Sequence, residues 1–372
     1  MNTKRAFSLF VFILFFFLLT GTSCHVARYV WWNFADINDY EKFPANSISS
    51  STRPIPFKIS SSQDAKIVFP KENGSSVGFE QFLNKHNTVA FLIIRNDSMI
   101  FEKYFGGFTR ESILPSFSVA KSFVSALIGI AIGEGKIRSV DQPITDFLPE
   151  LKDAGFRNVT FKDLLEMRSG ISFTEGYSNP FGSMAKFYYG LDLKKYTLAL
   201  KIQDSAGAYY NYQSANTQLL AMALEKATGK SLSRYLEEKI WQPMGAEYPA
   251  TWSVDSKSDQ QIKAFCCINA RAIDFAKFGQ LFLDRGKTGE MSVIPTSWVS
   301  ESLTIQTDSR DSEGIPYTYH WRVTEDGDFF AKGILGQYIY VCPEKRIVIV
   351  RFGKKSADIS WARYFRNLTR DL

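Results

Sequence analysis

Cysteine and histidine are scarce in this sequence, which has four cysteines and three histidines among 372 residues. There is no Cys-x-x-Cys pair and the histidines are scattered, so nothing indicates a metal site. Apart from Cys24, the cysteines are Cys266, Cys267 and Cys342. Because their number is odd and two of them are adjacent, we predict no disulfide framework and expect small hydrophobic side chains in the core.

Runs of lysine or arginine are also missing, and the formal net charge of +6 is modest for a chain of this length. No nucleic-acid-binding motif is present, so we do not expect nucleic acid as a partner. Apolar residues are abundant: 45% of the chain is hydrophobic and 15% is aromatic. A chain of this size and composition can bury a large core, so we expect a globular protein.

Residues 1–24 have the composition of a targeting segment. Lys4 and Arg5 precede an apolar run that ends at Leu19 and is short for a membrane span, and small residues lead up to Cys24. We therefore expect export to the cell envelope and attachment to the membrane through the N-terminus. The segment resembles a bacterial lipoprotein signal, in which Cys24 would be lipidated; a cleaved signal without lipid and an uncleaved anchor remain alternatives.

Residues 25–78 are predicted to form an extended arm, because aromatic clusters are followed there by a stretch rich in serine and proline. The arm should pack on the main body through its aromatic side chains, and we assign no chemistry to it. Residues 74–78 match Gly-x-Ser-x-Gly, but no strand runs directly into them, so a flexible turn is a better interpretation than a nucleophile elbow. Residues 79–372 are predicted to form the main domain.

The most informative stretch is the apolar segment 115–137, which predicts a buried helix that begins near Ser118 and stops at Gly133. Ser118 and Lys121 are three residues apart, so they share a helix face and the amine can reach the hydroxyl. A serine becomes a good nucleophile when a neighbouring base takes its proton. The helix N-terminus also adds free backbone N–H groups, so this arrangement suits acyl transfer.

A second match to the same short pattern runs from Ser183 to Lys186. Turn residues surround it, and a long buried helix is not indicated there. Because so short a pattern arises by chance in a chain of this length, we interpret the second match as a coincidence.

The remaining pattern predicts an α+β fold. Predicted strands cover residues 88–95, 99–105, 317–323, 329–343 and 346–352. Predicted helices cover residues 160–167, 217–225, 231–241, 270–283 and 357–368. If the late strands pair with the early hairpin, the result is one antiparallel sheet flanked by helices, with a helical region inserted between the two groups of strands.

Taken in order, several motifs resemble those of the serine hydrolases related to class C β-lactamases and low-molecular-weight penicillin-binding proteins. The resemblance covers nearly everything from Phe79 onward. It rests on Ser118-Val119-Ala120-Lys121, Asp141-Gln142-Pro143-Ile144, Leu164-Leu165 through Arg168-Ser169-Gly170, Tyr212, and Gly333 with Gly336-Gln337. The resemblance implies a β-lactamase/transpeptidase-like fold and places Tyr212 at the tyrosine of the family's Tyr-x-Asn motif.

Two motifs depart from the family pattern. Ser214 stands where the second motif usually ends in Asn, and the third motif reads Ala331-Lys332-Gly333 instead of Lys-Thr-Gly or His-x-Gly. These changes alter the groups that usually hold a substrate carboxylate, which weakens the case for β-lactams or D-alanyl peptides as substrates. Lys287-Thr288-Gly289 matches Lys-Thr-Gly literally, but it follows a predicted helix instead of lying on a strand beside the site.

The mechanism implied is a two-step acyl transfer on an ester or amide, in which Ser118 is the nucleophile and Lys121 and Tyr212 share its proton. Ser214 would contact the substrate, and the backbone N–H groups of Ser118 and Ile334, on the Gly333 strand, would bind the oxyanion. No metal or organic cofactor is required. We expect a monomer that acts on a small-molecule or peptide substrate; the alternative is an inactive relative that binds envelope components.

Overall fold

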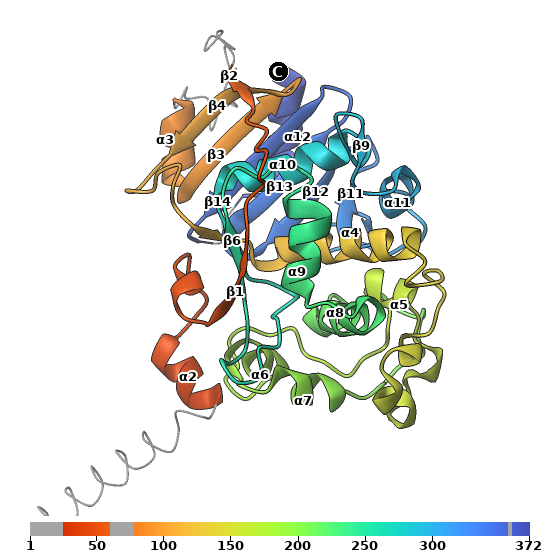
Figure 1. Cartoon of the computed structure of the whole chain (residues 1–372). Helices are drawn as coiled ribbons and strands as arrows, with labels where there is room; N and C mark the ends of the chain where they lie inside the picture. The colour runs from red at the N-terminus through yellow and green to blue at the C-terminus, as the bar shows by residue number, and fades with distance from the viewer. Residues whose placement is uncertain (1–24, 60–77, 356–358) are drawn as a thin grey trace, which may run out of the picture.

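The computed structural model describes residues 25–59, 78–355 and 359–372 (Figure 1). The predicted targeting segment with Cys24 lies outside the described residues, and so does most of the Gly-x-Ser-x-Gly match, whose last residue Gly78 precedes the first helix of the main domain. Across those three ranges, no helix has the length and apolar character needed to cross a membrane.

The main sheet has eight strands in the order β10-β11-β12-β13-β14-β3-β4-β2. All neighbours are antiparallel except β2 and β4, and β14 pairs with β3, so the late strands do close onto the early hairpin as predicted. The strands are β10 (Tyr317–Thr318), β11 (Trp321–Val323), β12 (Phe329–Gly333), β13 (Gln337–Cys342), β14 (Ile347–Gly353), β3 (Thr88–Arg95), β4 (Ser98–Tyr104) and β2 (Lys58–Ile59).

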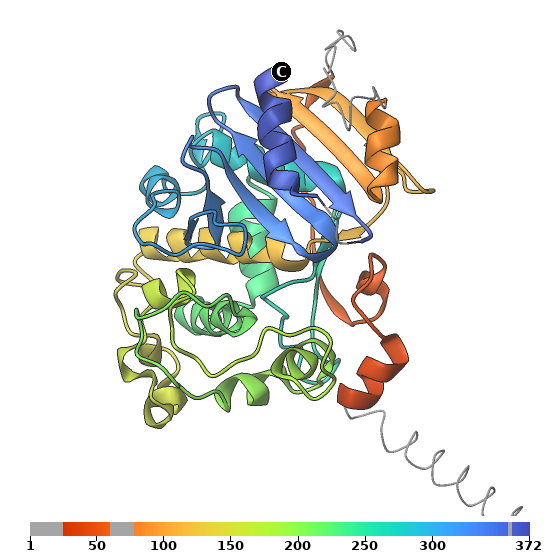
Figure 2. The ribbon, with the colours of Figure 1, turned by 180° about the vertical axis from the view of Figure 1, so that it is seen from behind.

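Helices cover both faces of this sheet (Figure 2). α3 (Phe79–Lys85) and α12 (Trp361–Asp371) lie on one face, and α10 (Ala272–Leu283) packs against the other. Because side chains alternate along a strand, Phe91 of β3 joins the core cluster under α3 and α12, whereas Leu92 joins the cluster on the side of α10. A strand buried on both faces is apolar throughout, as β3 is.

The predicted buried helix is α4 (Ala120–Gly133), preceded by one turn of 3₁₀-helix, η3 (Phe117–Val119). The helix runs between the sheet and the inserted helical region, so it is enclosed nearly all round (Figure 1). Gly129 permits the closest packing, because a Cβ atom there would lie 2.1 Å from the Trp298 ring. The prediction of a core helix is confirmed, and Ser118 lies in the 3₁₀ turn that precedes its N-terminus.

The inserted region is helical, as predicted, and most of it lies below the sheet and α4, while α9 (Leu232–Leu236) stands beside α4 (Figure 1). The first α-helix of the region, α5 (Phe161–Leu165), begins with a capping box, in which the side chains of Thr160 and Asp163 each accept a hydrogen bond from the other residue's backbone N–H group. The other helices of the region are α6 (Ser183–Tyr189), α7 (Leu193–Leu198), α8 (Ser214–Thr228) and the π-helical turn η7 (Glu237–Trp241). The 3₁₀ turns are η4 (Ile144–Asp146), η5 (Pro149–Ala154) and η6 (Phe156–Asn158).

Residues 25–59 are more regular than the extended arm that we predicted. They contain α2 (His25–Trp32), the turn η2 (Asp39–Glu41) and β1 (Ala45–Ile48). β1 joins a second sheet in the order β1-β6-β7-β5, formed with β6 (Ala250–Ser253), β7 (Ile268–Ala270) and β5 (Leu114–Pro115). The expected aromatic packing is confirmed by edge-on contacts of Tyr29 with Tyr189 and of Phe43 with Tyr188.

Several elements differ from the prediction. The stretches 317–323 and 329–343, each predicted as one strand, are each two antiparallel strands joined by a turn, β10 with β11 and β12 with β13. The last helix begins at Trp361 instead of residue 357, because Ser360 is its N-cap and accepts the Arg363 N–H. Lys287-Thr288 forms β8 (Lys287–Thr288), which pairs with β9 (Met291–Ser292) in a separate two-stranded sheet ahead of α11 (Thr296–Ser302). The literal Lys-Thr-Gly match is therefore not part of the main sheet.

Candidate active site

Ser118 and Lys121 lie one turn apart at the start of α4, and their side chains meet. The Lys121 amine donates to Ser118 Oγ at 3.0 Å, and only 1% of the lysine is exposed. A buried amine beside a hydroxyl is the arrangement that a serine nucleophile with a lysine base requires. The contact that the spacing predicted is thus present.

The Lys121 amine has two further partners, and both come from distant parts of the chain. It donates to Ser214 Oγ at 3.2 Å and to the Phe265 carbonyl at 2.9 Å. The two further contacts fix the position of the amine beside Ser118 Oγ, as proton transfer between a serine and its base requires.

Ser214 connects Lys121 to an acidic residue that the sequence analysis did not identify. Its hydroxyl donates to Glu175 Oε1 and its backbone N–H donates to Glu175 Oε2, both at 2.7 Å. The Tyr177 hydroxyl also donates to Glu175, at 2.8 Å. Burial and the nearby Glu175 raise the pKa of Tyr177, so its phenol stays protonated and able to donate. Glu175 and Tyr177 lie in a loop without periodicity, so no sequence signal pointed to them.

Tyr212 lies in the same cavity as Ser118, directly before α8. Its ring centroid is 5.1 Å from the Lys121 amine, and its ring meets Tyr317 edge-on at 5.9 Å. In the described part of the chain, the Tyr212 hydroxyl has no hydrogen-bond partner. The structure therefore brings the phenol to the site without a bond to Ser118, and such bonds often tighten only when substrate binds.

Gly333, the last residue of β12, lies against the turn that carries Ser118. A Cβ atom at Gly333 would lie 2.7 Å from the Ser116 carbonyl and 3.2 Å from the Ser118 backbone nitrogen. Ile334 follows in the turn η8 (Ile334–Gly336), which Arg351 supports by donating to the Gly336 carbonyl at 2.6 Å. This close approach puts the end of β12 against the backbone of Ser118, and Ile334, the next residue, lines the same two cavities as Ser118.

Replacing Gly333 with alanine is expected to lower kcat by about 10²- to 10³-fold, because β12 must move away from Ser118 and the oxyanion then loses a donor. The measurement is kcat and KM on an ester substrate, together with a thermal melt. Gly78→Ala is the matched control, since its added methyl meets nothing closer than 3.9 Å. A Gly333→Ala enzyme with unchanged kcat would show that this strand does not hold the oxyanion.

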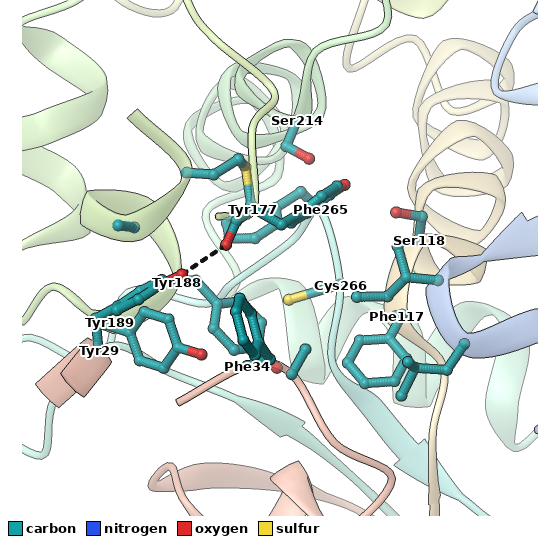
Figure 3. Close-up of a pocket in the computed structure, with 15 residues that line it drawn as sticks. Tyr29, Phe34, Phe117, Ser118, Tyr177, Tyr188, Tyr189, Ser214, Phe265 and Cys266 are labelled. Carbon is teal, nitrogen blue, oxygen red and sulfur yellow. Dashed lines mark hydrogen bonds between the residues drawn. The ribbon is translucent and has the colours of Figure 1, made fainter. Parts of the chain in front are cut away.

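Two cavities meet at Ser118. The first, of about 260 Å³, is walled by aromatic side chains (Figure 3), and the second, of about 300 Å³, is lined by charged and polar groups. Ser118, Tyr177, Ile334 and Leu335 border both cavities. A substrate whose carbonyl lies at Ser118 can therefore extend into an apolar cavity on one side and a polar cavity on the other.

The N-terminal arm supplies part of the aromatic cavity, which corrects our expectation that it has no role at the site. Tyr29 and Phe34 line the cavity across from Ser118 (Figure 3). The Tyr29 hydroxyl also donates to the Tyr177 carbonyl at 3.0 Å, which joins the arm to the loop of Glu175. The arm is separated from Ser118 by many residues without a motif, so sequence patterns gave no indication of this contact.

Cys266 and Cys267 are buried in the core, as predicted, but the expectation that they form no disulfide was wrong, because the two residues are bridged to each other. Adjacent cysteines close a bridge within one turn, and Cys267 adopts a left-handed φ of 73° there. Because this bridge uses two of the three cysteines after Cys24 and leaves Cys342 free, the odd number of cysteines was no argument against a disulfide. Cys342 is free and buried, as expected. Cys266 lines the aromatic cavity, next to the Phe265 carbonyl that accepts from Lys121.

The second Ser-x-x-Lys match is on α6, which borders the aromatic cavity through Met184 and Ala185. Lys186 is exposed, and within the described residues Ser183 and Lys186 make no hydrogen bond to each other. The geometry of Ser118 and Lys121 is therefore not repeated there. The same described ranges contain no group of three or more His, Cys, Asp or Glu side chains that could hold a metal ion.

A family profile described as Beta-lactamase matches residues 79–360. The chain belongs to the β-lactamase family. Within this family, a 6-aminohexanoate-dimer hydrolase from Paenarthrobacter ureafaciens is 28% identical over 293 residues, which cover 73% of this chain and 74% of the relative. A D-aminopeptidase from Brucella anthropi is 26% identical over 140 residues, which cover 37% of this chain and 26% of the relative.

Solved structures of this β-lactamase family fold are similar over most of the chain. A protein assigned as a 6-aminohexanoate-dimer hydrolase from Bacillus anthracis has a TM-score of 0.80 and 24% identity, and the match covers 92% of this chain and 93% of that one. A penicillin-binding protein from Bacillus halodurans has a TM-score of 0.62 and 17% identity, with coverage of 75% and 96%. The predicted β-lactamase/transpeptidase-like fold is confirmed, and the β-lactamase family member described here is a serine hydrolase.

Proposed function

We propose that this enzyme hydrolyses an amide or ester bond of a small molecule or peptide through an acyl-enzyme on Ser118. The observation that supports it most directly is the buried Lys121 amine, 3.0 Å from Ser118 Oγ, which also donates to Ser214 and the Phe265 carbonyl. A surface lysine would be mobile and hydrated, whereas this one is fixed beside the hydroxyl in a cavity that a substrate can enter.

In the first step, Ser118 Oγ attacks the carbonyl carbon while its proton passes to Lys121, with Tyr212 as the second group able to carry it. The developing oxyanion is held by the backbone N–H groups of Ser118 and Ile334. The proton is returned to the leaving amine or alcohol as its bond to carbon breaks. In the second step, water gives its proton to the same amine and attacks the acyl carbon. The bond from that carbon to Ser118 Oγ then breaks, the amine returns the proton to Oγ, and the acid is released.

We favour linear amides over β-lactams as the natural substrates. A relative that matches 73% of this chain is named a 6-aminohexanoate-dimer hydrolase, and a second relative is named a D-aminopeptidase. Ser214 and Ala331 replace the residues with which the family usually grips a β-lactam or D-alanyl carboxylate. A cavity on each side of Ser118, of about 260 Å³ and about 300 Å³, suits a linear chain better than a compact bicyclic ring.

The test is to react the full chain with a fluorophosphonate probe and to locate the adduct by mass spectrometry after trypsin digestion. Ser118 and Ser183 fall in different peptides, residues 111–121 and 169–186, so the adduct identifies the nucleophile directly. We expect the adduct on Ser118, together with hydrolysis of short esters and linear amides. A chain that takes no adduct and hydrolyses neither would instead be the inactive binding protein that is the alternative.

A further inference from the structure

The charged cavity contains a buried arginine with unused hydrogen-bond donors. Arg322, on β11, is only 9% exposed and lines the same cavity as Ser118. The guanidinium Nε donates to Asp311 at 2.6 Å. Within residues 25–59, 78–355 and 359–372, Asp311 is the only hydrogen-bond partner of the Arg322 side chain. The guanidinium also lies 5.6 Å from the Tyr212 ring centroid and 5.3 Å from that of Tyr317. The N–H groups on both Nη nitrogens therefore remain for a ligand.

Lys332 adds a second cation to the cavity. Lys332 lies on β12, opposite Tyr338 of β13, and lines the cavity. It forms an ion pair with Glu313. Glu313 also accepts the Ser360 hydroxyl at 2.6 Å. Burial raises the pKa of Glu313, but bonds from Lys332 and Ser360 outweigh it and hold that pKa below its usual range. Lys332 and Glu313 are thus both charged at neutral pH. The ammonium bonds Glu313 and the Tyr338 side chain, which leaves it one further N–H group.

The two acids near these cations are already occupied. Besides Arg322, Asp311 accepts the backbone N–H groups of Glu313 at 2.9 Å and Ile315 at 3.1 Å. Glu313 is bound by Lys332 and Ser360. The cavity therefore offers an anion unused donors on Arg322 without a free carboxylate to compete. A planar guanidinium fork against aromatic rings is the group that best matches a carboxylate.

We propose that this cavity is a subsite for a carboxylate carried by the substrate, which Arg322 binds directly and Lys332 supports. The inference rests on the proposed function and defines its substrate class: a linear amide with a negatively charged end. The carboxylate occupies the charged cavity, the scissile carbonyl lies at Ser118, and an apolar chain fills the aromatic cavity. The subsite differs from the grip at the first position of the family's third motif, since that position is Ala331 here.

The test compares three substrates of equal length: hexanoyl-6-aminohexanoate, the monohexylamide of adipic acid, and the uncharged carboxamide of the first. They place a carboxylate on the amine half, on the acyl half, or nowhere. We expect the wild type to prefer one carboxylate substrate over the carboxamide by about 10- to 100-fold in kcat/KM, as expected for a hydrogen-bonded charged group. We expect Arg322→Gln to remove that preference, so that its kcat/KM on the preferred carboxylate substrate falls about 10- to 100-fold further than its kcat/KM on the carboxamide.

Two results would overturn the proposal. A wild type that hydrolyses all three substrates equally has no carboxylate subsite. Equal losses on all three substrates in Arg322→Gln would mean that Arg322 acts on Tyr212, whose ring it contacts, and not on the substrate. Arg310→Gln is the matched control, because Arg310 donates to the Gly314 carbonyl and does not line the cavity; it should keep the preference.

Arg322→Gln leaves Asp311 without its ion pair, so two further variants keep the test decisive if that protein does not fold. Lys332→Gln, at a more exposed position, should reduce the preference in part. The double variant Arg322→Gln with Asp311→Asn removes both partners of the ion pair, so no unpaired charge is left, and it should lose the preference as Arg322→Gln does.

Calorimetric binding to the wild type needs no turnover, so it separates the two proposals. The ligands are 6-acetamidohexanoate and the monoethylamide of adipic acid, which carry the carboxylate on the amine half and on the acyl half, and the carboxamide of each. Tighter binding of one carboxylate than of its carboxamide, without hydrolysis, would preserve the subsite and reject the activity. Equal binding within both pairs would reject the subsite.

Discussion

Replacing Ser118 with alanine is expected to reduce kcat on an ester or amide substrate by on the order of 10⁶-fold, the size of loss found when a serine hydrolase loses its nucleophile. The substitution removes the only hydroxyl that the Lys121 amine can reach in the turn before α4, and it removes the atom on which the acyl group is carried. The fold should survive, because Ser118 packs at the edge of a cavity and alanine is smaller. The measurement is single-turnover hydrolysis together with fluorophosphonate labelling, which should disappear.

The control for this experiment is Ser183→Ala, at the start of α6. It carries the same sequence pattern but not the same geometry, since Lys186 is exposed. Hydrolysis and labelling should therefore stay at the wild-type level. Loss of labelling in Ser183→Ala with retention in Ser118→Ala would reverse the assignment and would make the Ser118 pair a structural feature of the core.

The parts of the fold that could be predicted are those in which the spacing or hydrophobicity of neighbouring residues directly reflects their burial and contacts in the structure. β3 reads as an unbroken apolar run because helices cover both of its faces. α4 reads as an apolar helix for the same reason. Ser118 and Lys121 meet because residues three apart share a helix face, so their contact follows from spacing alone. Tyr212 and Gly333 lie far away in sequence, and only the order of motifs indicated them.

The missed residues reach the site through contacts that no local pattern encodes. Glu175 bonds Ser214 across 39 positions, from a loop whose sequence has no period. Arg322 sits on a three-residue strand, too short to show which of its side chains face a cavity. Tyr29 comes from an arm that precedes the domain. Each of these is decided by tertiary packing, which composition and periodicity do not report.

Two of the missed residues, Tyr29 and Arg322, line the cavities, whereas the proposed reacting groups lie deeper in the fold. Ser118, Lys121 and Gly333 belong to the turn η3, the central helix and the sheet. The cavity walls also include residues of the arm and of the loops beside α6 and β11. Because loops accept sequence changes more readily than core elements do, we expect these segments to determine which substrates the site accepts.

Replacing Lys121 with methionine is expected to reduce kcat by about 10³- to 10⁴-fold, at the upper end of the range for loss of a general base. Methionine fills the buried space of the lysine side chain but can neither accept the Ser118 proton nor donate to Ser214 and the Phe265 carbonyl. Ser214 still has Glu175 as a partner, so the main polar atom left unpaired is one carbonyl oxygen. KM should change little, because Lys121 faces the serine and not the substrate-binding walls.

Lys121→Arg distinguishes a base from a positive charge, because a guanidinium keeps the charge and the hydrogen bonds but cannot give up its proton at neutral pH. If Lys121 takes the proton of Ser118, arginine should be no better than methionine. The matched control is Lys186→Met, on the exposed face of α6. Substantial activity in Lys121→Arg would assign the base to Tyr212 and leave the lysine as its electrostatic partner, 5.1 Å from the ring.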